Sequence, residues 1–182
     1  MTSRFLTAAA VVTVVVCVAG TGPASAALID FEFDGTYKQP YDFSTKGAGW
    51  NELDTLNGGS KVYEGLNWVT DWEVVSKGMI EDYYHSDWKS SPGDEAAYNG
   101  DGATPMTAEA SNFHAFKLGE AEFRAWPWRN DTYNASATDI KITGFLNGNT
   151  TGDVVKSLAA DDWETVSLGK LGKIDKFEVG LD

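Results

Sequence analysis

Short segments in which apolar and polar residues alternate run along most of the chain. In "ALIDFEF" (residues 27–33), the apolar residues Ile29, Phe31 and Phe33 occupy every second position, which is the period of a half-buried strand. Six further segments predict strands, and the first of them is expected to form two strands around a bend at Gly65. They read "GSKVYEGLNWVTDWEVVS", "NFHAFKL", "AEFRAWPW", "DIKITGFLNG", "TVSLG" and "KIDKFEVGL".

Turn-forming residues separate these segments, and helical periodicity is scarce. "GFLNGNTTGDVV" predicts a hairpin, because Asn147 and Gly148 tolerate the left-handed conformations that tight turns require. "GDEAAYNG" and "TAEASNF" are each expected to form one helical turn. Many short strands without long helices indicate an all-β chain, folded as an antiparallel β-sandwich or barrel.

The first 26 residues have the pattern of a secretory signal peptide. Arg4 precedes an apolar run from Phe5 to Ala19, and Ala24-Ser25-Ala26 offers small residues to a signal peptidase. We expect cleavage after Ala26 and a secreted, extracellular protein. A lipoprotein anchor at Cys17 is the alternative, which the bulky Val16 before it disfavours.

The remaining 156 residues, 27–182, suit one domain with a sizeable core, and they contain no cysteine. Without Arg4 the charge is 13 − 27 = −14. So acidic a chain argues against nucleic acid and anionic membranes as partners. It is compatible with calcium and with uncharged glycans.

The order of several motifs resembles a known group of proteins. "IDFE" is followed by "YEGLNW", "SSPGDEAAYNG", "FKLGEAEFRAW" and "IKITGFLNG", and the chain ends in "WETVSLGKLGKIDKFEVGLD". This pattern is similar to that of a poorly characterised group of secreted bacterial and fungal proteins that resemble carbohydrate-binding modules. The resemblance implies a single-domain antiparallel β-sandwich of jelly-roll type over residues 27–182. Two segments depart from the pattern by being richer in aromatic residues, residues 79–88 and "WPWRNDTYN".

The resemblance also implies a structural calcium ion between the first strand and the last. Carboxylates are the ligands that calcium prefers, and Asp30, Glu32 and Asp175 would supply them. The alternative is that these are ordinary acids on the polar faces of strands.

Few residues suit catalysis. The only histidines are His85 and His114, and we expect His114 to be structural or exposed. A copper enzyme that needs an N-terminal histidine is excluded by Ala27. A polysaccharide lyase remains open, with Tyr83, His85 and Arg129 as its parts, and so does a glycoside hydrolase that uses two of the many acids.

The aromatic residues give the strongest functional hypothesis. Trp68 and Trp126 lie in strand-like segments among apolar residues, so we expect both in the core. Other aromatics lie in loop-like surroundings, where rings stack on sugars while acids and amides bind hydroxyl groups. The expected ligand site consists of Tyr83, Tyr84, His85, Trp88, Trp128, Arg129 and Asn130.

The sequence thus favours a secreted carbohydrate-binding protein. The alternatives are a polysaccharide-degrading enzyme on the same scaffold and a protein that interacts with a host or cell surface. Sequons at Asn130, Asn134 and Asn149 would carry glycans in a eukaryotic host.

Overall fold

The computed structural model describes residues 10–18, 25–29, 50–69, 72–78, 81, 95–99, 105–112, 114–125, 139–158 and 162–181. Strands dominate this part of the chain; α1 is a single helical turn, η2 is a short 3-10 turn, and residues 77–78 and 81 also have helical conformation. The elements are β1 (Ala10–Val18), β2 (Ser25–Ile29), β3 (Trp50–Glu52), α1 (Leu53–Leu56), β4 (Val62–Tyr63), β5 (Leu66–Trp68), β6 (Trp72–Ser76), β7 (Glu95–Asn99), β8 (Met106–Ala110), β9 (Lys117–Ala125), β10 (Asp139–Leu146), β11 (Asn149–Ser157), β12 (Glu164–Ser167), η2 (Gly169–Leu171) and β13 (Lys176–Leu181).

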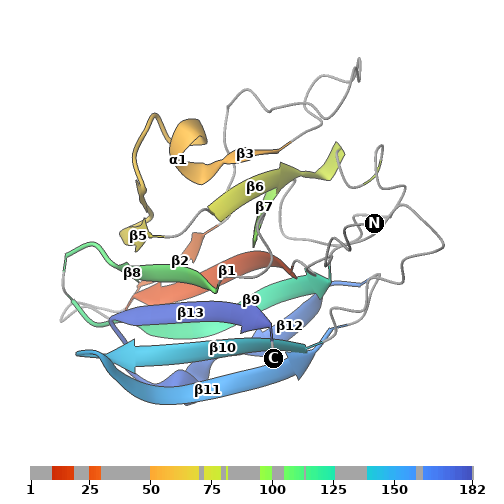
Figure 1. Ribbon diagram of the computed structural model, residues 1–182. Coiled ribbons are helices and arrows are strands. Elements are labelled where there is room, and N and C mark those ends of the chain that lie inside the picture. The colour runs from red at the N-terminus through yellow and green to blue at the C-terminus, as the bar shows by residue number, and fades with distance from the viewer. Residues whose placement is uncertain are drawn as a thin grey trace, which may run out of the picture.

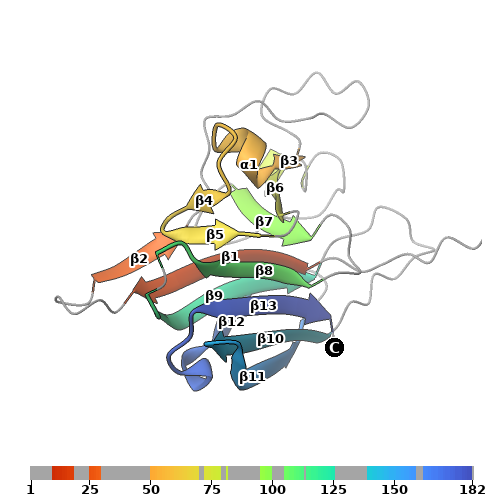
Figure 2. The same cartoon turned by 60° about the vertical axis from the view of Figure 1, so that its left-hand side comes forward.

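The strands form two antiparallel sheets. The seven-stranded sheet has the order β12-β9-β1-β7-β6-β3, with β2 paired to β1, and the six-stranded sheet has the order β11-β10-β13-β8-β5-β4. Both views of the ribbon show the six-stranded sheet lying against the seven-stranded sheet (Figures 1 and 2). The expectation of an all-β antiparallel sandwich is therefore confirmed.

One cluster of buried residues fills the space between the sheets. Trp68 of β5 and Trp72 of β6 belong to different sheets, and their rings meet edge to face with centroids 4.6 Å apart. Phe177 of β13 adds a second edge-to-face contact with Trp68 at 6.3 Å. The Trp68 indole N–H donates to the carbonyl of Tyr63 at 3.1 Å, so its polar atom is satisfied although the side chain is 1% exposed. The prediction that Trp68 is a core residue is confirmed.

The alternation of apolar and polar residues along β10 shows how the sequence determines which side chains lie on the inner and the outer face of the sheet. Ile140 and Ile142 are buried in the core, while Lys141 and Thr143 between them are half-buried on the outer face. Gly144 follows on the inner face, where a larger residue would meet the segment from Leu171 to Ile174. Since the side-chain period of a strand is two, this pattern fixes which face of the sheet becomes the outer surface.

Two turns use left-handed conformations at the expected places. Asn147 and Gly148 have φ of 52° and 77° between β10 and β11, which confirms the predicted hairpin. Glu64 and Gly65, with φ of 49° and 79°, join β4 to β5. The bend predicted at Gly65 is thus a two-residue turn, and the same sequence segment continues into a third strand, β6.

Two expectations of local helix were wrong. The "GDEAAYNG" segment contains β7, and "TAEASNF" overlaps β8. Each strand lies between two others, β7 between β1 and β6 and β8 between β13 and β5. Backbone pairing on both sides, with Ala97 and Ala108 fully buried in the core, overrides the weak helical preference of Ala and Glu.

The segment that resembles a signal peptide contributes β1, which pairs with β9, β7 and β2. These pairings are those of the uncleaved chain. They do not test cleavage after Ala26, which stays a prediction. In the described ranges, no helix is long and apolar enough to cross a membrane.

Candidate functional site

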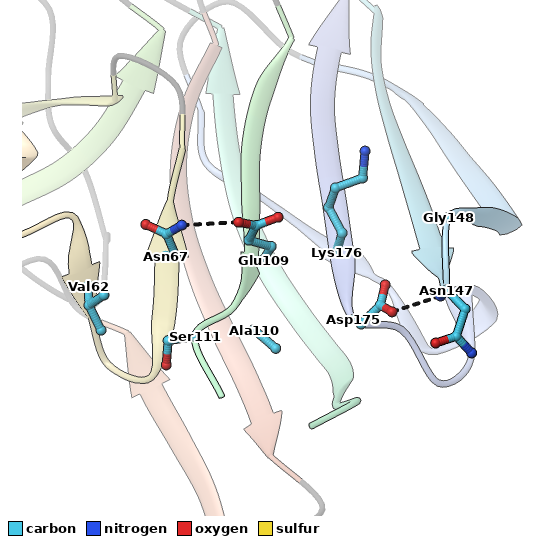
Figure 3. A pocket seen from close by; sticks show the side chains of 9 residues that line it. All are labelled: Val62, Asn67, Glu109, Ala110, Ser111, Asn147, Gly148, Asp175 and Lys176. Carbon is cyan, nitrogen blue, oxygen red and sulfur yellow. Dashed lines mark hydrogen bonds between the residues drawn. The ribbon is translucent and has the colours of Figure 1, made fainter. Parts of the chain in front are cut away.

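A groove of about 580 Å³ opens on the outer face of the six-stranded sheet. Residues from four strands, β4, β5, β8 and β13, and from the turns beside them line it (Figure 3). They are Val62, Asn67, Glu109, Ala110, Ser111, Asn147, Gly148, Asp175 and Lys176. Most of these side chains are polar, and none of these nine lining residues is aromatic.

Strand register brings the polar residues into one row. Asn67 of β5 pairs with Glu109 of β8, Glu109 pairs with Lys176 of β13, and Lys176 pairs with Phe145 of β10. Each is half-buried beside a core residue of its own strand. Because residues directly opposite on paired strands share a face, the row crosses the outer surface of the sheet.

Asn67 and Glu109 hold each other in place on one side of the groove. The Asn67 amide Nδ2 donates to Glu109 Oε1 at 3.0 Å (Figure 3). This bond orients the amide oxygen of Asn67 and leaves Oε2 of Glu109 outside any hydrogen bond within the described part of the chain. Two acceptor atoms of fixed orientation are therefore available to a ligand.

Lys176 carries the cation of the row, and its charge is already engaged. Its Nζ donates to Glu178 Oε1 at 2.7 Å and lies 4.0 Å from the centroid of the Phe145 ring. The side chain extends away from Asp175 in Figure 3. With Lys176 balanced by Glu178, the groove keeps the negative charges of Glu109 and Asp175.

The opposite wall is the turn between β10 and β11. Asp175 Oδ2 accepts the backbone N–H of Asn147 at 2.7 Å, and the Asp175 N–H donates to the carbonyl of Phe145 at 2.8 Å. Both bonds thus join the β10 side of the hairpin turn to Asp175, the residue that precedes β13. A wall held this way keeps its shape when a ligand arrives.

The wall on the side of β4 and β5 is fixed in a similar manner. The Gly65 carbonyl accepts the backbone N–H of Ser111 at 3.1 Å and its hydroxyl at 2.8 Å. Val62, about half exposed, adds an apolar edge to this side. The groove therefore combines amide and carboxylate acceptors with a small apolar surface, a combination suited to a ligand with many hydroxyl groups.

A second group of polar residues lies on the outer face of the seven-stranded sheet. Arg124 of β9 is 1% exposed, and Oε2 of Glu122 on the same face is buried without a hydrogen bond. Burial raises the pKa of the Glu122 carboxyl. Val75 and Ala96 on the same face are fully buried as well, so this part of the face is covered, whereas Glu120 farther along β9 is exposed.

Most of the residues predicted from the sequence to bind a ligand or metal lie outside the described residues. These are Asp30, Glu32, Tyr83, Tyr84, His85, Trp88, Trp128, Arg129 and Asn130. Trp126, expected in the core, and the sequon residue Asn134 are likewise outside. The structure neither gathers these residues nor separates them.

Three predicted residues can be placed. Asp175 lies in the groove, where one of its oxygens caps the β10–β11 turn. His114 is exposed, as expected of a structural or surface histidine, and Asn149 is exposed at the start of β11. Among the described residues, no three His, Cys, Asp or Glu side chains gather in a way that would hold a metal ion.

Sequence reasoning missed Asn67, Glu109 and Lys176 as site residues. The available signal was a polar residue between two apolar ones in "LNW" and "AEA", and a lysine directly before an apolar residue in "DKF". That pattern identifies outward positions but says nothing about which strands are neighbours. Compared with known proteins, the chain matches no family model, no curated protein and no solved structure.

Proposed function

We propose that this chain is a secreted carbohydrate-binding protein of jelly-roll type, and that the groove on the six-stranded sheet is a glycan site. The observation that carries the proposal is the row formed by Asn67 and Glu109, continued by Asp175 at the facing wall. Amide and carboxylate oxygens with fixed directions accept hydrogen bonds from sugar hydroxyl groups. An open groove also admits the middle of a long polymer, which a closed cavity would exclude.

The negative charge of the groove limits the class of glycan that it would bind. Glu109 and Asp175 remain negative in the groove, while Lys176 is paired with Glu178. An acidic groove on a chain of net charge −13 repels polymers that carry carboxylates or sulfates. Neutral polysaccharides therefore fit the groove better than uronates do.

The second part of the proposal concerns the aromatic residues that the sequence places in loop-like segments. Stacking on Tyr83, Tyr84, Trp88 and Trp128 would add the apolar contact that the groove itself has in small measure at Val62. The proposal keeps structural calcium at Asp30, Glu32 and Asp175, with one oxygen of Asp175 already used by the turn.

The test is a binding and product assay on a panel of neutral and acidic polysaccharides. Glu109→Gln removes one charge and keeps the oxygen that Asn67 contacts. We expect this variant to bind about tenfold more weakly, since a hydrogen bond to a charged group contributes about 1.5–3 kcal/mol. Asp153→Asn is the matched control, because Asp153 is an exposed acid on β11 of the same sheet, outside the groove.

Each outcome distinguishes a site or a class of protein. Binding that Glu109→Gln weakens and Asp153→Asn leaves unchanged would support the groove. Binding lost only in a Trp88→Ala, Trp128→Ala double variant would move the site to the loops. Release of soluble products by the wild type would identify a polysaccharide-degrading enzyme, and no retention on any glycan would favour the protein-interaction alternative.

A further inference from the structure

The groove on the six-stranded sheet is longest in the direction that crosses the strands. Its lining comes from β4, β5, β8 and β13 and from the β10–β11 turn, and the longest stretch that one segment contributes is Glu109 to Ser111. Neighbouring strands lie about 4.8 Å apart, so the distance from β4 to β13 is about 14 Å, whereas three successive residues of one strand span about 7 Å. Figure 3 shows the lining side chains of these strands beside one another. A long ligand therefore fits across the strands better than along them.

One outward side chain from each of the four strands forms a line across the groove. Val62 of β4 pairs with Asn67 of β5. Asn67 pairs with Glu109 of β8, which pairs with Lys176 of β13. Because directly opposed residues on paired strands share a face, these residues stand in one line on the outer surface. The line repeats at the strand spacing of about 4.8 Å.

This line has hydrogen-bond acceptors in its middle and apolar surface at its two ends. Asn67 and Glu109 present amide and carboxylate oxygens whose directions their mutual bond fixes. Val62, at one end, is 48% exposed. At the other end, the Lys176 ammonium is bound to Glu178 at 2.7 Å, so the methylene stem is the part of that side chain that lines the groove. The order of surfaces is therefore apolar, acceptor, acceptor, apolar.

We propose that the groove binds an extended linear chain of neutral sugars joined by equatorial 1,4 linkages, which crosses the sheet with one ring on each of β4, β5, β8 and β13. This inference rests on the proposed glycan site and narrows its ligand to one class. In such a chain each ring advances by a distance close to the spacing of neighbouring strands, so consecutive rings meet consecutive residues of the line. The two inner rings donate hydroxyl hydrogen bonds to Asn67 and Glu109. The two outer rings pack their C–H faces on Val62 and on the stem of Lys176.

A coiled chain does not follow the same line. Axial 1,4 linkages turn each ring relative to the one before it, so the chain curves away from a straight row of residues. Two hairpin turns with left-handed residues bound the row, at Gly65 between β4 and β5 and at Asn147 and Gly148 between β10 and β11. Contact with an extended chain is thus limited to about four rings, one for each strand of the line.

Titration calorimetry with neutral oligosaccharides of increasing length tests the inference on the protein expressed from the full chain. The equatorial series consists of cello- and manno-oligosaccharides. We expect its affinity to rise about fivefold with each added ring up to about four rings and then to stay constant, because each ring gains one contact. Axially linked malto-oligosaccharides of the same length should bind at least about tenfold more weakly, because only part of the chain reaches the line.

Three exposed valines provide matched variants for the direction of the chain. Val62 lies in the line, Val69 lies farther along the chain from β5, and Val155 lies on β11 outside the groove; their exposed fractions are 48%, 42% and 49%. Val62→Ala should weaken binding of the four-ring oligomer about fourfold and leave binding of the two-ring oligomer unchanged, because only an outer ring loses its contact. Val69→Ala and Val155→Ala should change neither affinity.

Three results would overturn the inference and leave the groove as the glycan site, provided that Glu109→Gln still weakens binding. They are an affinity that does not depend on chain length, equal affinities for the equatorial and axial series, and a loss in Val69→Ala instead of Val62→Ala. If no neutral oligosaccharide binds, or if Glu109→Gln leaves the affinity unchanged, the proposed function itself is wrong and this inference fails with it.

Discussion

Replacement of Gly144 by alanine tests the packing that supports the groove wall. Gly144 is buried on the inner face of β10, next to the bulge that precedes the β10–β11 turn. An added Cβ would lie 2.8 Å from Ile174 Cγ2, 2.9 Å from Thr151 Oγ1 and 3.2 Å from Leu171 Cβ. Contacts that short force neighbouring atoms to move.

The two hydrophobic neighbours have little room to yield, because Ile174 is fully buried and Leu171 is 1% exposed. Overpacking of this kind costs about 1–3 kcal/mol. For a domain of this size, the loss corresponds to a decrease in Tm of about 2–12 °C. Urea unfolding followed by tryptophan fluorescence measures the free energy of unfolding directly. An m-value equal to that of the wild type shows that the variant exposes the same surface area when it unfolds.

Gly169→Ala is the matched control for this substitution. Gly169 lies in η2 and is exposed, and a Cβ added there would meet no heavy atom within 4 Å beyond its chain neighbours. We expect the stability of this variant to stay within about 1 kcal/mol of the wild type, or to rise slightly because alanine restricts the unfolded chain. Equal stability of the Gly144 and Gly169 variants would refute the packing of β10 against residues 171–174.

Two further predictions concern titration and metal binding. Because burial raises the pKa of Glu122, its contribution to stability is present at low pH and is lost as pH rises through the folded-state pKa. Glu122→Gln should therefore make the decrease in Tm above about pH 4.5 less steep. Glu120→Gln, at an exposed position of the same strand, should leave that decrease unchanged. Parallel curves of Tm against pH for the two variants would contradict this prediction. Calcium should raise the Tm of the secreted protein and magnesium should not, and the effect should disappear in an Asp30→Asn, Glu32→Gln double variant; an equal Tm with calcium or with a chelator would contradict the metal site.

The local features of the fold were readable from the sequence. Alternation identified β10 and β13, and the Asn147-Gly148 pair identified the turn between β10 and β11. These features depend on residues close in sequence, whose conformational preferences are expressed without help from distant parts of the chain.

Strands rich in alanine were not readable in the same way. "EAAYN" and "MTAEA" have weak intrinsic preference for strand, and their conformation follows from pairing with neighbours on both sides. The groove depended even more on distant residues, because Asn67, Glu109 and Lys176 meet only through the register of three strands. No local pattern in the sequence specifies that register.

The central claim is that the groove on the six-stranded sheet binds a neutral glycan. The most direct measurement compares the affinities of the wild type, Glu109→Gln and Asp153→Asn for the neutral polysaccharide that the wild type retains best. We predict a loss of about tenfold for Glu109→Gln and a change within about twofold for Asp153→Asn. Equal affinity of all three proteins would contradict the assignment of the groove as the glycan site.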